Sequence, residues 1–350
     1  MFCADPPPGS RKQANSRRET TVTSMVSNGG TTRADAALES KKQQLLTAYM
    51  SFAPNPKNVE TVVALKEGAP GAPRLFFCPA TDGTISYLRN YIPYLPEDWW
   101  FYGCQTPGLE GERTPFRTIE EIAAYDVEKI LAIQPEGPYH IGGFCNGGLV
   151  AYEICKKLKE KGHEIALCLD LLPLFPRQWT DLAHLESPRK RVVQDFLFVF
   201  EEFLGNSMTD FPVESVLSQK DDVQIDTFLR LLREHGYLRN DQEEQLFRHR
   251  VNVYNAGLEA MLAYKPTNFQ GVIDVIAAGE EERYKNEIQA DSPYATHLCV
   301  VQSNQKRVHY VDVPGKTFVN GQQPGLDKIG EVIRSITTRV ALKQPVETCR

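Results

Sequence analysis

The chain has 350 residues, with 39 Lys and Arg against 45 Asp and Glu, and its formal net charge is −6. This balance argues against nucleic acid as the main ligand, because a phosphate-binding face normally shows as a basic excess. Hydrophobic residues make up 41% of the chain, enough to build a core. No run approaches the roughly 18 apolar residues that a membrane span needs. We therefore expect a cytoplasmic enzyme or binding protein without a membrane span.

Eight cysteines are scattered along the chain without a CxxC pair. This spacing argues against a zinc site and against a disulfide framework, so we expect no metal. Cys78, Cys155 and Cys168 fall in strongly apolar runs, where a reduced and buried thiol is the expected state.

Residues 1–40 differ in composition from the rest of the chain, because Pro, Ser, Thr, Gly and Arg dominate them. Such a segment cannot bury enough apolar surface to offset the entropy lost on ordering, so we predict a disordered N-terminal tail. Its Ser- and Arg-rich composition also resembles an organelle transit peptide, although it lacks an amphipathic apolar face.

Strands alternate with helices from Val59 onward. Apolar and β-branched runs predict the strands, and apolar residues at helical spacing predict helices at 85–95, 118–133, 147–161 and 326–340. This alternation predicts an α/β fold, with a mostly parallel sheet covered by helices on both faces. The predicted strands are Val59–Leu65, Arg74–Ala80, Trp99–Cys104, Tyr139–Phe144, Ile165–Leu171, Gly271–Ala278 and Arg307–Val313.

Residues 179–263 interrupt the alternation with three helical patterns and no convincing strand. A helical insert in an α/β sheet is most simply a lid over the strand ends. Its Phe-rich stretch, from Phe196 to Phe203, is either lid core or the lining of an apolar substrate channel.

The segment Gly143-Phe-Cys145-Asn-Gly147 joins a predicted strand to a predicted helix. This is the pattern of a nucleophile elbow, in which the glycines permit a strained turn that lifts the central side chain to the top of the sheet. The positive end of the following helix favours a thiolate, which is the reactive form of cysteine. We therefore predict that Cys145 is a nucleophile rather than a buried cysteine in a glycine turn.

Other parts of such a site are predicted by their position. Asp170 ends the next strand, where the acidic residue of an elbow site is expected. Oxyanion donors should come from the backbone of Asn146 and from the loop after an early strand, in which Ala80 is the expected donor.

These segments together resemble the thioesterase domains of nonribosomal peptide and polyketide synthases, within the α/β-hydrolase superfamily. The resemblance runs from Val59 to Val340, and its nucleophile and acid positions match Cys145 and Asp170. It implies an α/β-hydrolase domain at 55–345 with a helical lid at 179–263. The matching segments are LFFCPATDG followed by Tyr87, YGCQTPGL, TIEEIAAYDVEKI, GPYHIGGFCNGGLVAYEICKKL, LCLDLLP, LEAMLAYKPTNFQGVIDVIAA and VDVPGKTF.

The resemblance also implies a function, that of a stand-alone thioesterase-like enzyme in secondary metabolism. Its substrates would be acyl, peptidyl or polyketide thioesters of an acyl or peptidyl carrier protein that it meets in trans. The acceptor would be water or a small molecule. We expect no cofactor of the chain's own, because the donor carries the phosphopantetheine.

Thr317 departs from the family pattern. The family reads Val-Pro-Gly-x-His-Phe after the last strand, and this chain has Thr317 where the histidine would be the general base. Threonine cannot accept a proton at neutral pH, so the usual triad is incomplete. No histidine is an obvious replacement. We expect His309 in mid-strand, about five residues or roughly 16 Å below the catalytic edge. The others considered are His140 in a strand, His163 at the opposite edge, and His184, His235 and His249 in the lid.

Two functions therefore stay open. In the first, Cys145 forms an acyl-enzyme intermediate, because a thiol needs less base assistance than a hydroxyl. The acyl group is then released by hydrolysis or by transfer to an amine or hydroxyl. In the second, the protein is a catalytically degenerate thioesterase that binds acyl chains or a carrier protein without turnover.

Overall fold

The computed structural model describes Ser40 and residues 61–171, 211–212, 215–216, 218–267, 269–278, 303–311 and 325–342. The predicted tail, apart from Ser40, and much of the predicted lid lie outside these residues. None of the described helices combines the length and the apolar character that crossing a membrane requires.

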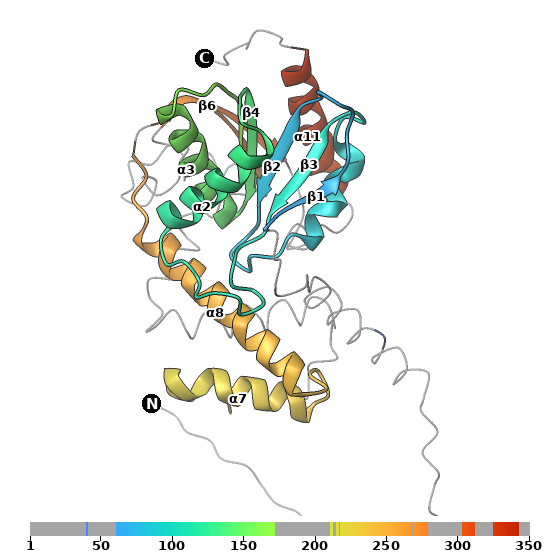
Figure 1. Ribbon diagram of the computed structural model, residues 1–350. Helices are drawn as coiled ribbons and strands as arrows, with labels where there is room; N and C mark the ends of the chain where they lie inside the picture. Colours follow the sequence, from blue (N-terminus) through green and yellow to red (C-terminus); the bar gives the residue numbers. More distant parts are fainter. Residues whose placement is uncertain are drawn as a thin grey trace, which may run out of the picture.

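In the described part of the chain, a seven-stranded sheet forms the centre of the fold (Figure 1). Its order is β1-β3-β2-β4-β5-β6-β7, and only the edge pair of β1 and β3 is antiparallel. The predicted mostly parallel sheet is therefore confirmed, and β4 and β5 have the predicted bounds. The strands are β1 (Val62–Lys66), β2 (Arg74–Cys78), β3 (Trp100–Cys104), β4 (Tyr139–Phe144), β5 (Ile165–Leu171), β6 (Phe269–Ala278) and β7 (Ser303–Val311).

Helices cover both faces of this sheet (Figure 1). On one face lie α2 (Ile119–Ile133) and α3 (Asn146–Glu160), and on the other η1 (Ser86–Tyr94) and α11 (Gly325–Ala341). Successive residues of a strand point to opposite faces. In β5, Cys168 accordingly joins the core under α2 and α3, and Leu169 joins the core under α11. Burial on both faces explains why β5 is a continuous apolar run.

Local sequence signals set several helix boundaries. The side chain of Thr118 accepts a hydrogen bond from the Glu121 amide at 3.2 Å, so Thr118 caps the N-terminus of α2. The segment predicted as a helix at 85–95 forms η1, a 3-10 helix that contains Pro93. Proline has no N–H to donate within an α-helix, which favours the tighter and shorter form here.

Within the predicted lid, the structure describes α7 (Asp221–Glu234) and α8 (Asp241–Ala263). The rings of Phe228 and Phe247 meet between them at a centroid distance of 6.3 Å. In Figure 1, α7 lies away from the sheet, and the long α8 runs from it toward the sheet. There α8 packs against both α2 and α3, so it connects this helical part to the rest of the fold.

Asp274 in β6 ties β6, β7 and α11 together from a fully buried position. Its carboxylate accepts hydrogen bonds from Arg307 at 2.6 and 2.9 Å and from Arg339 at 2.8 Å, and it lies 3.0 Å from His309 Nε2. Burial alone would raise the pKa of Asp274, but these three donors hold it well below its usual value. The carboxylate is therefore charged in the fold and compensated by its neighbours.

We predict that Asp274→Asn lowers the free energy of unfolding by about 3 to 5 kcal/mol, because it leaves the guanidinium groups of Arg307 and Arg339 without a counter-charge. Urea unfolding monitored by circular dichroism measures this loss. The matched control is Glu234→Gln, which breaks the exposed Arg230–Glu234 ion pair of 2.6 Å. That variant should change stability by less than about 0.5 kcal/mol. Equal effects of the two substitutions would contradict a central role for Asp274.

Candidate active site

Cys145 occupies the junction between β4 and α3 in a strained backbone conformation. Its φ is 56° and its ψ is −120°, and it is the only non-glycine residue with positive φ in the described part of the chain. Its amide donates a hydrogen bond to the Leu171 carbonyl at 2.9 Å, which ties the turn to the end of β5. Strain of this kind persists only where the surroundings enforce it, and it is a feature of functional sites. The predicted elbow is therefore present in its backbone geometry.

The glycines around Cys145 leave no room for a side chain. A Cβ on Gly143 would lie 1.9 Å from the Gly147 carbonyl oxygen, and a Cβ on Gly147 would lie 2.3 Å from the Pro79 carbonyl oxygen. The start of α3 thus contacts both the end of β4 and the loop after β2 through bare backbone. This close approach holds Cys145 at the carboxyl edge of the sheet, at the positive end of the α3 dipole.

Asp170 lies beside the elbow on β5, where it pairs in register with Gly143. It is buried, and a Cβ on Gly148 would lie 2.1 Å from its Oδ1 atom. That oxygen has no hydrogen-bond partner among the described residues, and burial raises the pKa of Asp170 to about 7. The structure thus places the buried carboxyl group of Asp170 against the first turn of α3. Its Oδ1 atom can accept a hydrogen bond.

The predicted oxyanion donors flank the elbow. Asn146 is the first residue of α3, and amides of a first helical turn lack an intrahelical carbonyl partner. The Ala80 amide, in contrast, donates a hydrogen bond of 2.8 Å to the Tyr87 hydroxyl. A substrate oxygen must displace that hydroxyl before it can bind the Ala80 amide.

Tyr87 is a site residue to which the sequence analysis assigned no role. Its ring packs edge-on against Phe144, the residue before Cys145, at a centroid distance of 5.5 Å. Burial raises the pKa of the Tyr87 hydroxyl well above its ordinary value, and the negative charges of Asp82 and Cys145 add to this. The hydroxyl therefore stays protonated and can donate. In the sequence, the position of Tyr87 after the LFFCPATDG segment was the only indication that it belongs to the site. The hydrogen bond between its hydroxyl and the Ala80 amide is visible only in the fold.

Asp82 is an acidic residue in the loop after β2 that carries Ala80, which we call the oxyanion loop. Burial raises its pKa to about 6, although a hydrogen bond from Thr84 and the charge of Arg250 oppose that shift. The pKa of Asp82 thus lies closer to neutrality than that of an exposed carboxyl group. The Thr-Asp-Gly sequence at this position is an ordinary turn signal, so it did not mark Asp82 as a site residue.

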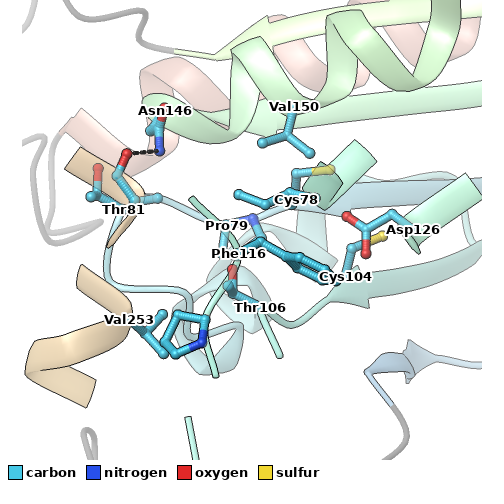
Figure 2. A pocket seen from close by; sticks show the side chains of 14 residues that line it. Cys78, Pro79, Thr81, Cys104, Thr106, Phe116, Asp126, Asn146, Val150 and Val253 are labelled. Carbon is cyan, nitrogen blue, oxygen red and sulfur yellow. Dashed lines mark hydrogen bonds between the residues drawn. The ribbon is translucent and has the colours of Figure 1, made fainter. Parts of the chain in front are cut away.

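Helix α8 reaches the same region from the predicted lid. The side-chain amide of Asn146 donates a hydrogen bond of 3.5 Å to the Gly257 carbonyl, and a Cβ on Gly257 would lie 3.1 Å from the methyl group of Thr81. Figure 2 shows Asn146 and Thr81 on one side of a small cavity and Val253 of α8 below them. The oxyanion loop is therefore held between α3 and α8.

None of the described histidines contacts Cys145 or Asp170 through a hydrogen bond that the structure shows. His140 is buried against the Trp99 ring, and burial lowers its pKa to about 4. The register places His309 level with Ile276, Leu171 and Phe144, so the expectation that it lies five residues below the catalytic edge is wrong. It is three strands from Phe144, about 14 Å, and it contacts Asp274. The remaining ones contact Tyr139 (His163), Phe211 (His235) and Gln245 (His249).

Thr317 lies outside the described residues, and so does His184. Of the predicted site residues, the structure therefore brings together Cys145, Asp170, Ala80 and Asn146.

Residues 73–311, more than half of the chain, match the thioesterase domain family. Polyketide synthase PksR of Bacillus subtilis (strain 168) is 34% identical over 102 residues, which make up 29% of this chain and 4% of that synthase. The chain spans less than a tenth of the length of this and several other curated synthases that it matches.

Two solved structures share the fold. A four-domain nonribosomal peptide synthetase bound to AMP and glycine is 20% identical, with a TM-score of 0.58 over 83% of this chain and 21% of that chain. The NocB thioesterase domain, in covalent complex with a fluorophosphonate nocardicin G analog, is 19% identical, with a TM-score of 0.51 over 79% of this chain and 98% of that chain. The family match and the mostly parallel sheet agree, and the chain belongs to the thioesterase domain family, with an α/β-hydrolase fold.

Proposed function

We propose that this thioesterase-family chain accepts an acyl group from a carrier-protein thioester onto Cys145. The acyl group is then released to water, an amine or a hydroxyl. The observation that carries the proposal is the backbone of Cys145, held at φ 56° at the start of α3 by glycines that contact neighbouring backbone. This strain has no structural use if Cys145 is only a packing residue. A nucleophile needs it, because it projects the thiol above the sheet.

The acylation step exchanges one thioester for another. The Cys145 thiolate attacks the carbonyl carbon, a carbon–sulfur bond forms, and the bond to the phosphopantetheine sulfur breaks. The proton of the Cys145 thiol ends on the departing phosphopantetheine thiol. Because the bonds made and broken are of the same kind, the step is close to thermoneutral. It needs less base assistance than attack by a serine hydroxyl would.

The oxyanion that forms during attack would be stabilised by amides of Asn146 and Ala80. Such donors contribute most when they are in place before the reaction and shielded from water. The loop that carries Ala80 meets this condition, since α3 and α8 contact it on two sides. The protonated hydroxyl of Tyr87, which must leave the Ala80 amide when the oxyanion binds there, would be a further donor if it stays beside that amide.

Release of the acyl group is the step most affected by Thr317. Water is a weak nucleophile without a general base, and the residue at the family's histidine position cannot take its proton. An amine acceptor attacks a thioester with its own lone pair and depends less on such a base. Transfer to a carrier-bound or free amine is therefore the favoured outcome, and hydrolysis the slower one.

A second function, binding of acyl chains or a carrier protein without turnover, is favoured by one observation. The buried Oδ1 atom of Asp170 lacks a hydrogen-bond partner among the described residues, and the pKa of that carboxyl group is raised to about 7. None of the described histidines donates a hydrogen bond to Asp170, so Asp170 orients no base among the described residues. Iodoacetamide labelling separates the two functions, since only the enzyme requires a hyperreactive Cys145.

We predict that an activated acyl thioester adds one acyl mass to the full chain at the peptide containing Cys145. Intact-mass and peptide mass spectrometry measure this. Cys145→Ala should remove the label, whereas Cys168→Ala, which alters a buried cysteine in β5, should retain it. Cys145→Ser should acylate at least about 100-fold more slowly, because a hydroxyl without a base has almost no anionic form. If none of a broad panel of acyl thioester donors labels Cys145, the proposal that the protein is an enzyme is wrong.

We predict that Thr317→His speeds hydrolysis of the acyl-enzyme. If residue 317 occupies the position of the family's histidine, the new imidazole can pair with Asp170, whose carboxylate would fix the ring tautomer. General-base assistance is typically worth a factor of about 10² to 10⁴, and a ring held off its ideal geometry would give less. A single-turnover release assay on pre-acylated protein measures the change.

Thr317→Gln is the matched control for that assay, because it adds a polar side chain without a basic nitrogen. Equal acyl-enzyme lifetimes in the wild type and Thr317→His, with both proteins folded and acylated, would mean that the missing base does not limit water attack. Rapid hydrolysis by the wild type would indicate another base, which alanine substitutions at His184, His235 and His249 would identify.

A further inference from the structure

Two thiols and a carboxyl group converge next to the oxyanion loop. Cys78 and Cys104 are the last residues of the neighbouring parallel strands β2 and β3, one position beyond the registered pair Phe77–Gly103. Their side chains therefore point to the same face of the sheet, where α2 contributes Asp126. Figure 2 shows the three groups together at one end of the cavity. All three residues are at most 2% exposed.

The distances suit a common ligand. The two Sγ atoms and a carboxylate oxygen all lie within 4.8 Å of one another. With zinc–sulfur bonds of about 2.3 Å and zinc–oxygen bonds of about 2.1 Å, a tetrahedral ion holds its ligand atoms roughly 3.4 to 3.8 Å apart. Movements of about 1 Å or less would bring the three groups to that spacing. Ordinary side-chain rotation supplies such movements.

Asp126 gives independent support for a ligand at this place. Its Oδ1 atom is buried and has no hydrogen-bond partner among the described residues. A buried polar atom without a partner costs about 1 to 3 kcal/mol, and a bound cation would remove that cost.

The cavity beside these three residues extends toward the oxyanion loop and has room for a fourth ligand of a bound ion. Its walls include all three groups, and they continue past Pro79 to Ala80 and Asn146. The cavity as a whole has room for about one water molecule, which is the usual fourth ligand where a protein supplies three.

We propose that Cys78, Cys104 and Asp126 bind a thiophilic divalent cation of the zinc type, with a water molecule as the fourth ligand. Binding releases to solvent the protons that the thiols and the carboxyl group hold, so that two thiolates and one carboxylate, with three negative charges together, surround the doubly charged ion. This site goes beyond the acyl chemistry of Cys145 and does not depend on it. It also departs from the sequence expectation of no metal, since the ligands come from three separate elements.

A disulfide between Cys78 and Cys104 is the main competing use of the two thiols. It would leave the Oδ1 atom of Asp126 without a partner, whereas a cation satisfies all three groups. The involvement of Asp126 therefore separates the two possibilities.

The experiment is a Cd²⁺ titration of the full chain, reduced, free of any affinity tag and carrying Cys145→Ala to remove the elbow thiol. Near-ultraviolet absorbance reports Cd²⁺–thiolate bonds directly. We expect a saturable signal of one ion per chain. Cys78→Ser and Cys104→Ser should each abolish tight binding, and Asp126→Asn should weaken it by about tenfold or more. Cys168→Ser, the matched buried cysteine, should bind as the reference chain does.

Saturating Zn²⁺ should also raise the melting temperature of the reference chain and leave that of folded Cys78→Ser unchanged. Absence of a saturable Cd²⁺ signal in the folded reference chain would overturn the proposal. Equal affinities of the reference chain and Asp126→Asn would overturn it as well, because the site would then be a thiol pair alone.

Discussion

Direct packing of backbone against backbone at the start of α3 is the constraint on which the rest of the site depends. Gly143, Gly147 and Gly148 each face a carbonyl or carboxyl oxygen at a distance that admits no Cβ. Helix α3 can therefore begin immediately above β4, and the chain turns through Cys145 with a positive φ. Any side chain at these glycines would push α3 away and lower the thiol toward the sheet.

That packing also places the groups around Cys145. The Gly147 contact fixes the loop after β2, and this loop carries Ala80 and its hydrogen bond to Tyr87. The Gly148 contact fixes Asp170. Helix α8 closes the loop from the other side through Asn146 and Thr81. Movement of α8 would consequently act on both oxyanion donors, Asn146 and the loop that carries Ala80.

Asp274 and Asp170, two buried aspartates on neighbouring strands, show how hydrogen-bond partners set the pKa of a carboxyl group. Asp274 has two arginines and a histidine around it, and its pKa lies well below the usual value. Asp170 is also buried, but burial dominates, and its pKa rises to about 7. The first is a structural ion pair, whereas the Oδ1 atom of the second has no hydrogen-bond partner among the described residues. Asp126 belongs with the second kind, and one of its carboxylate oxygens and the thiols of Cys78 and Cys104 lie within 4.8 Å of one another.

The sequence by itself determined the alternation of strands and helices, the elbow at Cys145 and the position of Asp170 at a strand end. These features are local, because apolar periodicity and glycine spacing act within about ten residues. Only the tertiary structure decided the strand order, the register that places His309 opposite Ile276, and the contact of Tyr87 with Ala80. It also brought together two cysteines and an aspartate from β2, β3 and α2, which no spacing in the chain predicts. Contacts between distant segments depend on how the elements pack, and the packing is settled by the whole core at once.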